Sequence, residues 1–181
     1  MSQEIKKVVV LGPECTGKSA LAEFLAKKFR TAWVGEFART YINQLQKPYE
    51  AADLLLIAKG QLALEDSVTP RANKLLVCDT DLYVIKIWSL FKYGYCEPEI
   101  LKSIATRKYD LYLLTYIDIP WEEDPQREHP DQRNRLYEIY LNEMRNQPVP
   151  FIEIKGPREQ RRAMASEAIK NLIQPANTPT P

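Results

Sequence analysis

The chain has 181 residues, with 25 basic against 24 acidic side chains and a formal net charge of +1. A chain of this length forms one domain with a substantial core, and a second catalytic domain does not fit. Because the charges nearly balance and no basic stripe occurs, general nucleic-acid binding is disfavoured. No apolar run approaches the roughly 18 residues of a membrane span, so we expect a small molecule as the partner, and neither nucleic acid nor a membrane.

The three cysteines, Cys15, Cys78 and Cys96, are an odd number without C-x-x-C spacing. Such a set supports neither a disulfide framework nor a zinc site, and it favours a reducing compartment such as the cytoplasm. Residues 174–181 include three prolines and no large apolar side chain. We therefore predict a single domain over residues 1–173 and a disordered tail over 174–181.

Five short apolar segments alternate with helical or irregular stretches, at residues 7–11, 32–34, 75–78, 111–117 and 151–154. This alternation is typical of the α/β class and predicts a five-stranded parallel sheet with helices on both faces. Ligands of such sheets gather at the carboxyl ends of the strands. Five residues fall just after the apolar segments and are expected at that edge, namely Gly12, Glu36, Asp79, Asp118 and Gly156.

Residues 12–19 read G-P-E-C-T-G-K-S and match the phosphate-binding pattern G-x-x-x-x-G-K-[ST], which predicts a P-loop NTPase. Gly12 and Gly17 let successive N–H groups converge on phosphate oxygens, and the following helix adds its positive N-terminus. Lys18 is placed to reach the β- and γ-phosphates, and the Ser19 hydroxyl to bind Mg²⁺. We therefore expect ATP and Mg²⁺ as cofactors, contacted by Gly12, Glu14, Cys15, Thr16, Gly17, Lys18, Ser19 and Ala20.

Residues 35–41 read G-E-F-A-R-T-Y and bring a carboxylate, a guanidinium and a phenol together after the second segment. A hydroxyl group that accepts a phosphoryl group needs a base or an orienting carboxylate, which Glu36 can supply. Arg39 is placed to hold the acceptor or the transferred phosphoryl group. The alternative is an ion-pair network at the start of a helix.

Two stretches between the strands have the character of helices. Residues 51–66 carry apolar side chains at helical spacing, and residues 68–70 end this helix at a proline. Residues 82–93 are strongly apolar and aromatic. We expect most of their side chains in the core and one or two of the aromatic ones against a planar substrate.

Asp79 ends the third apolar segment in a carboxylate, at the position of a Walker-B residue. It is therefore expected to hold Mg²⁺ beside Ser19. Asp81 has two interpretations, a contact to the substrate or the N-cap of the helix that begins at Leu82.

Residues 120–135 are charged, rich in proline and without apolar periodicity, which predicts a mobile lid after the fourth strand. Arginines that close over a γ-phosphoryl group stabilise its charge and exclude water. Of Arg127, Arg133 and Arg135, we favour Arg127 for this role, with a solvated surface charge as the alternative for each. His129, the one histidine, is expected to be exposed.

The turn at residues 155–158 follows the fifth strand, where P-loop kinases often border the adenine of ATP. Gly156 and Arg158 are therefore expected to contact the cofactor. The N-K-x-D sequence that reads guanine does not occur, so a GTPase is disfavoured.

The order of these elements and motifs resembles the ribosylnicotinamide kinase domain of NadR-type proteins of NAD salvage. The run E-F-A-R-T-Y at 36–41 is similar to the family pattern E-[YF]-[GA]-R-x-Y, and P-W-E-E-D-P-Q-R at 120–127 is similar to P-W-x-x-D-[GP]-x-R. Further similar positions are I-A-K-G-Q at 57–61 and D-T-D at 79–81. The resemblance covers nearly the whole chain except its tail.

The resemblance implies transfer of the ATP γ-phosphoryl group to the ribose 5′-hydroxyl of nicotinamide riboside, which gives nicotinamide mononucleotide. The resemblance also implies which residues act in catalysis, bind the metal ion and contact the substrate. The catalytic residues are Lys18, Glu36, Asp79 and Arg127, the metal ligands are Ser19 and Asp79, and the substrate contacts are Glu36, Arg39, Tyr41, Asp81 and Trp121.

Two other functions stay open from the sequence. One is a kinase for a deoxynucleoside or another nucleoside, and the other is an ATP-hydrolysing switch without an acceptor. A nucleoside monophosphate is a weaker candidate, because only Arg39 lies near the second strand to hold its phosphate. The nucleotidyl-transfer motif of the NadR adenylyltransferase domain is missing, so we expect that this chain does not complete NAD by itself.

Overall fold

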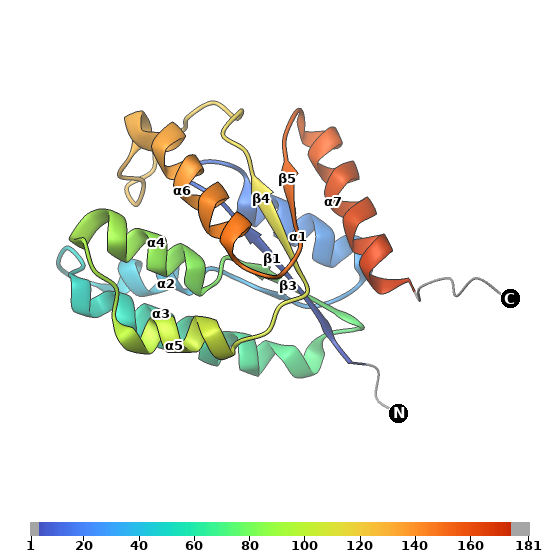
Figure 1. Cartoon of the computed structure of the whole chain (residues 1–181), viewed down its shortest axis with the longest axis horizontal. Coiled ribbons are helices and arrows are strands. Elements are labelled where there is room, and N and C mark those ends of the chain that lie inside the picture. Colours follow the sequence, from blue (N-terminus) through green and yellow to red (C-terminus); the bar gives the residue numbers. More distant parts are fainter. Residues whose placement is uncertain (1–3, 175–181) are drawn as a thin grey trace, which may run out of the picture.

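The computed structural model describes residues 4–174 and contains one five-stranded parallel sheet in the order β2-β3-β1-β4-β5 (Figure 1). The strands are β1 (Lys6–Leu11), β2 (Trp33–Val34), β3 (Leu75–Asp79), β4 (Leu111–Thr115) and β5 (Phe151–Ile154). The α-helices are α1 (Lys18–Phe29), α2 (Phe37–Gln44), α3 (Ala51–Val68), α4 (Leu82–Tyr93), α5 (Pro98–Thr106), α6 (Arg133–Asn146) and α7 (Arg158–Ile173). The α/β fold expected from the alternation of apolar segments is confirmed.

The three inner strands are largely apolar because helices cover both of their faces. In β1, the side chains from Val8 to Leu11 are completely buried. Val8 pairs in register with Val77 of β3 and with Leu111 of β4. Such continuous apolar runs are typical of strands buried on both faces of a parallel sheet.

Successive residues of β1 enter two different cores. Val8 and Val10 pack with α1 and α7 on one face, whereas Val9 and Leu11 pack with α3, α4 and α6 on the other. Helices α2 and α5 do not cover the sheet directly and form a third cluster with α3 and α4. Figure 1 shows this group to one side of the sheet, below the loop that joins β4 to α6. This arrangement leaves space between α2, α4 and the carboxyl ends of the strands.

The structure differs from the sequence expectations in several boundaries. Strand β4 ends at Thr115 rather than at residue 117, and β2 has only two residues. Helices α5 and α6 were not predicted, and α6 begins at Arg133, so the last three residues of the expected lid are helical. The predicted tail at 174–181 lies, apart from Gln174, outside the described residues.

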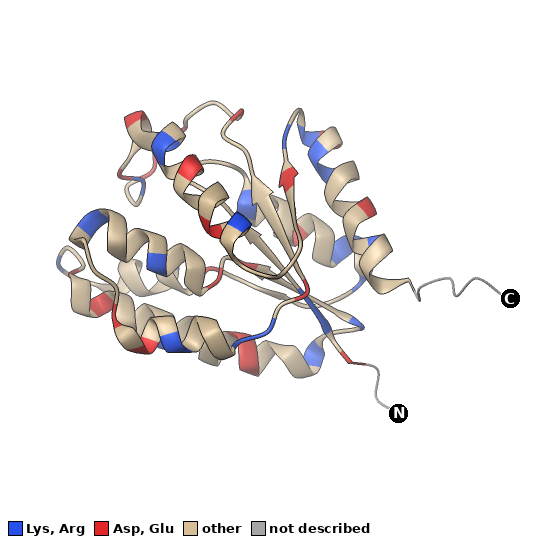
Figure 2. Cartoon of the chain, viewed as in Figure 1, with Lys and Arg blue, Asp and Glu red and all other residues tan. Residues whose placement is uncertain are grey.

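Charged side chains of both signs are interspersed over the helices in Figure 2. This distribution agrees with the near-zero net charge. Within residues 4–174, none of the helices has both the length and the apolar character required to cross a bilayer.

Gly12 provides a test of how the first loop is attached to the sheet. A Cβ atom at Gly12 would lie 2.5 Å from Thr115 Oγ1 and 2.7 Å from the Thr115 carbonyl oxygen, whereas at Gly94 it would meet no atom within 4 Å. Both residues have a positive φ. We expect Gly94→Ala to cost about 1 kcal/mol of unfolding free energy through backbone strain, and Gly12→Ala to cost about 2 kcal/mol more through the collision. Urea denaturation measures both, and equal losses would contradict the close contact.

Candidate nucleotide and acceptor site

The loop between β1 and α1 has the backbone of an anion-binding nest. Gly12, Cys15 and Gly17 all have positive φ, at 143°, 54° and 77°. Gly17 is the N-cap of α1 and supplies no side chain, so no side-chain cap covers the first N–H groups of the helix. These groups and the positive end of the helix dipole are a favourable site for phosphate.

The loop is fastened by hydroxyl groups on its sheet side. Thr16 Oγ1 donates to the Pro13 carbonyl at 2.8 Å and lies 2.7 Å from Thr115 Oγ1, which in turn donates to the Leu11 carbonyl at 3.0 Å. Lys18 Nζ crosses the loop and donates to the Pro13 carbonyl at 2.8 Å. The lysine ammonium group is therefore held at the loop, as the P-loop motif predicts.

A cleft of about 720 Å³ opens beside this loop and reaches between α2, α4 and α6. Polar groups gather at the loop end, where Lys18, Ser19, Glu36 and Asp79 all line the cleft. Apolar and aromatic side chains also line the cleft and form its aromatic wall, namely Trp33, Val84, Ile87, Trp88, Leu136 and Tyr140. Such a lining suits a ligand that combines a charged or reactive group with a planar apolar one.

Asp79 is a buried carboxyl group in the lining of the cleft. Its side chain is 1% exposed, and burial raises its pKa to about 6, with a further contribution from the negative charge of Glu36. The Ser19 hydroxyl and Lys18 act in the opposite direction. Among the described residues, Asp79 Oδ1 has no hydrogen-bond partner. A buried carboxylate oxygen without a partner, next to a hydroxyl group, fits the oxygen ligands that Mg²⁺ prefers.

Glu36 faces the cleft because another side chain occupies the start of its helix. It is the N-cap of α2 but makes no capping hydrogen bond. Gln61 of α3 takes that place: its Oε1 accepts from Phe37 N at 2.8 Å and its Nε2 donates to the Gly35 carbonyl at 3.2 Å. The carboxylate of Glu36 is thereby left available to a ligand. The sequence singled out Gln61 only within a motif, and its role follows from the fold.

The segment between β4 and α6 lies across the cleft and is fastened first to α2. Asp124 Oδ2 accepts from Arg39 Nη1 at 3.1 Å, and Gln126 Nε2 donates to Asn43 Oδ1 at 2.6 Å. Arg39 lines the cleft as expected, but its charge is paired with Asp124. The alternative interpretation of Arg39 as part of an ion pair therefore holds, with the lid as its partner.

The same segment is also fastened to the phosphate loop and to α4. Glu14 Oε2 accepts from the backbone N–H groups of Glu128 at 3.0 Å and His129 at 3.1 Å. Lys92 Nζ pairs with Glu128 Oε1 at 2.9 Å. Arg127 Nη1 donates to Cys15 Sγ at 3.3 Å, so this guanidinium lies beside the phosphate loop.

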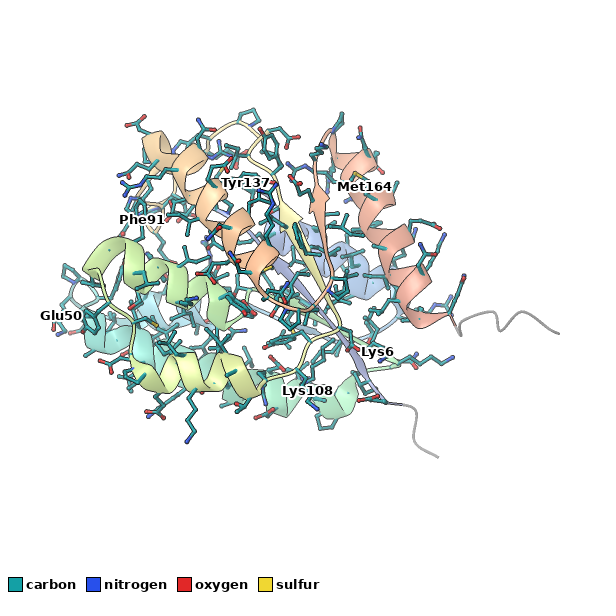
Figure 3. The ribbon with its side chains drawn as sticks, viewed as in Figure 1. Lys6, Glu50, Phe91, Lys108, Tyr137 and Met164 are labelled. Atoms are coloured by element: carbon teal, nitrogen blue, oxygen red, sulfur yellow. The ribbon has the colours of Figure 1, made fainter. Side chains whose placement is uncertain are left out.

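The other two lid arginines differ from Arg127 in their surroundings. Arg133 belongs to α6 and donates to the carbonyl oxygens of Cys15 and Ile119, both at 3.0 Å. Arg135 lies over the ring of Phe91, 5.2 Å from its centroid, and does not line the cleft. Figure 3 marks Phe91 near the end of α4.

Of the two interpretations of Asp81, the structure shows the N-cap. Its carboxylate is buried, accepting from Tyr83 N at 2.9 Å and from Tyr112 Oη at 3.0 Å. Burial raises its pKa to about 7. His129 is not exposed, because its ring packs edge-on against Phe91 at 5.0 Å and its side chain is 17% exposed.

Tyr41 and Trp121, expected at the substrate, do not line the cleft. Tyr41 Oη donates to Asp53 Oδ1 at 2.8 Å and joins α2 to α3. The Trp121 indole donates to Glu123 at 3.1 Å, and its ring centroid lies 5.9 Å from the guanidinium of Arg127 and 5.8 Å from that of Arg133. The expected contacts of Tyr41 and Trp121 with a substrate ring are therefore not supported by their positions.

A second cavity of about 610 Å³ lies on the other side of the phosphate loop. Gly156 and Arg158, expected near adenine, line it together with Gly17 and Ala20. Asp118, expected at the ligand-binding edge of the sheet, also lines it, as does Arg161, which the sequence analysis did not single out. A single arginine inside a helix carries no recognisable pattern, so only the fold brings it to this position.

The family model for the AAA domain matches residues 7–161. A curated relative, the trifunctional NAD biosynthesis/regulator protein NadR of Salmonella typhimurium, is 25% identical over 159 residues, which are 83% of this chain and 38% of the relative. The chain therefore spans well under half the length of this relative.

Two solved structures have the same fold. One is a NadR protein in complex with NR, with a TM-score of 0.77 at 21% identity, covering 93% of this chain and 50% of that one. The other is thymidylate kinase from Candida albicans, with a TM-score of 0.70 at 15% identity, covering 94% and 93%. The fold is thus that of the P-loop kinases. Since the family model matches most of the sequence, the chain belongs to the AAA domain family.

Proposed function

We propose that this protein is a kinase that transfers the γ-phosphoryl group of ATP to the 5′-hydroxyl of nicotinamide riboside, giving nicotinamide mononucleotide in NAD salvage. The observation that carries the proposal is one cleft in which a phosphate-binding loop, the unpaired Glu36 carboxylate and an aromatic wall meet. Likeness to NadR, a protein whose solved structure holds NR, favours this acceptor among nucleosides.

In the proposed reaction, the loop N–H groups and Lys18 bind the phosphates of ATP, whose base occupies the second cavity. Glu36 accepts the proton of the ribose hydroxyl group while the hydroxyl oxygen forms a bond to the γ-phosphorus. The bond between the γ-phosphorus and the β,γ-bridging oxygen breaks, and ADP leaves. Ser19 and Asp79 would hold Mg²⁺, which neutralises phosphate charge when it is bound. The hydrogen bond from Arg127 to Cys15 of the phosphate loop supports a role for Arg127 at the transferred group.

The charges at the acceptor end favour a nucleoside over a nucleotide. Arg39 lines the cleft and is already paired with Asp124, so these two charges offset each other. Glu36 and Glu122 add negative charge to the lining of the same cleft. An acceptor with its own phosphate would be repelled by these carboxylates, whereas the aromatic wall offers stacking to a planar base.

We also propose that the protein is located in the cytoplasm. Cys15, Cys78 and Cys96 are all free thiols in the structure, which is typical of proteins in a reducing compartment. A small-molecule acceptor is the one partner that this proposal requires.

The first test follows ADP release from ATP and Mg²⁺ with a panel of nucleosides. Release should be slow without an acceptor and strongly accelerated by nicotinamide riboside. Lys18→Ala should abolish it, because the loop loses its charge at the phosphates. Lys27→Ala is the matched control, since Lys27 is an exposed residue of the same helix that pairs with Glu23. Fast release without any acceptor would favour a switch, and acceleration only by a deoxynucleoside would replace the substrate.

Glu36→Gln tests the assignment of the base. The amide keeps the size of the side chain but does not accept a proton, so we expect kcat to fall by about 100-fold or more with the acceptor KM within about threefold. Steady-state kinetics with Glu23→Gln as a surface control gives both values. Full turnover by Glu36→Gln would assign proton transfer to another group.

The raised pKa of Asp79 predicts a pH dependence of nucleotide binding. Magnesium binding needs the ionised carboxylate, which is the minority form below pH 6. The magnesium-dependent gain in affinity for a non-hydrolysable ATP analogue should therefore increase from pH 5 to 7 and then level off. Calorimetric titrations with and without Mg²⁺ measure it. Asp79→Asn should lose this gain at every pH, and an unchanged pH profile in that variant would refute the assignment.

A further inference from the structure

Arg161, one turn into α7, joins the two halves of the proposed ATP site. Arg161 is 5% exposed, and its guanidinium group donates four hydrogen bonds. Nε donates to the Gly156 carbonyl at 2.9 Å, Nη1 to the Thr16 carbonyl at 2.9 Å, and Nη2 to the Tyr116 carbonyl at 2.7 Å and to the carboxylate of Asp118. These partners come from the phosphate loop, from the end of β4 and from the turn after β5.

Asp118 completes a closed ring of hydrogen bonds around that turn. Its Oδ1 accepts from Arg161, and its Oδ2 accepts from Gly156 N at 2.5 Å. Both backbone groups of Gly156 are therefore held by the Arg161–Asp118 pair. Gly156 has a φ of 91° and lines the second cavity, so the pair defines the shape of that wall.

The bond to Thr16 acts on the phosphate loop through the geometry of the peptide group. In a trans peptide, the C=O of one residue and the N–H of the next point in opposite directions. Holding the Thr16 carbonyl against Arg161 therefore turns the Gly17 N–H away from Arg161. Gly17 has a φ of 77° and the wide conformational freedom of glycine, so this peptide would reorient easily without an external hold.

We propose that Arg161, oriented by Asp118, is a positioning residue that preorganises both the phosphate loop and the turn at Gly156 for the nucleotide. The inference rests on the proposed ATP site and requires no contact between Arg161 and the nucleotide. A site whose peptides are fixed before binding loses less conformational freedom on binding, and affinity increases accordingly. Arg161 thus acts on ATP affinity through Thr16 and Gly156.

Arg107 offers a matched control for the general effect of losing a partly buried arginine. Its Nη2 donates to the Leu62 carbonyl at 3.2 Å and to Asp66 at 2.7 Å, so it joins α5 to α3. It lines neither cavity. Arg107→Lys should therefore lower the unfolding midpoint and leave the KM for ATP within twofold of the wild type.

The experiment compares Arg161→Lys with Arg107→Lys in the full chain. Lysine keeps the charge but lacks the planar fork that reaches separate carbonyl groups. We expect Arg161→Lys to raise the KM for ATP at least tenfold while the acceptor KM stays within twofold. Calorimetry should show weaker binding of ADP and a smaller but measurable loss for inorganic tripolyphosphate, which reports on the phosphate loop alone. A folded Arg161→Lys variant with a wild-type KM for ATP would overturn the proposal, as would equal losses in Arg107→Lys.

Asp118→Asn is the second variant, and it decides the question if Arg161→Lys does not fold. Asparagine retains one oxygen for Arg161 but presents an amide N–H group toward Gly156 N. We expect at least threefold weaker ADP binding with a smaller effect on tripolyphosphate, and wild-type ADP affinity would refute the role of the pair. These binding measurements need no acceptor. A wild type that binds ADP but phosphorylates no nucleoside would therefore refute the proposed function while the role of Arg161 is still decided.

Discussion

The contact between Gly12 and Thr115 determines where the phosphate loop lies. The loop crosses the end of β4 so closely that a methyl group at Gly12 would overlap the Thr115 hydroxyl and carbonyl oxygens. The Thr115 hydroxyl also bonds to Leu11 and Thr16, so one side chain joins two strands and the loop. Because every residue of β4 is buried and the strand lies inside the sheet, the loop is attached to a closely packed part of the fold.

The charges around this loop are arranged for ligands. Asp79 and Glu36 repel each other, and the protein gives Asp79 Oδ1 no partner among the described residues. Gln61 accepts a hydrogen bond from the first backbone N–H group of α2, so the Glu36 side chain does not cap this helix. A cation at Asp79 would reduce this repulsion and provide a partner for Oδ1, and a hydroxyl group of a ligand would provide a partner for Glu36. The free protein is therefore less stable at this cleft, and its side chains are available to a ligand.

Much of the fold follows from local patterns in the sequence. The apolar runs of β1, β3 and β4 and the glycine-rich loop are contiguous signals, and they predicted the sheet and the positions of Lys18, Ser19 and Asp79. The start of α6 was missed because Arg133 and Arg135 continue the charged composition of the lid. The sequence predicts substrate contacts for Asp81, Tyr41 and Trp121 only because these residues lie within motifs. Their actual partners, Tyr112, Asp53 and two arginines, are distant in the sequence or depend on side-chain direction, which a pattern does not contain.

The lid has consequences for the sequence of events in a catalytic cycle. It is fastened to α2, to the phosphate loop and to α4, and Ile119 at its base lines both cavities. A displacement of Ile119 would therefore alter the walls of both cavities together. In the proposed reaction, the release of ADP and the release of the phosphorylated nucleoside would then depend on the same segment.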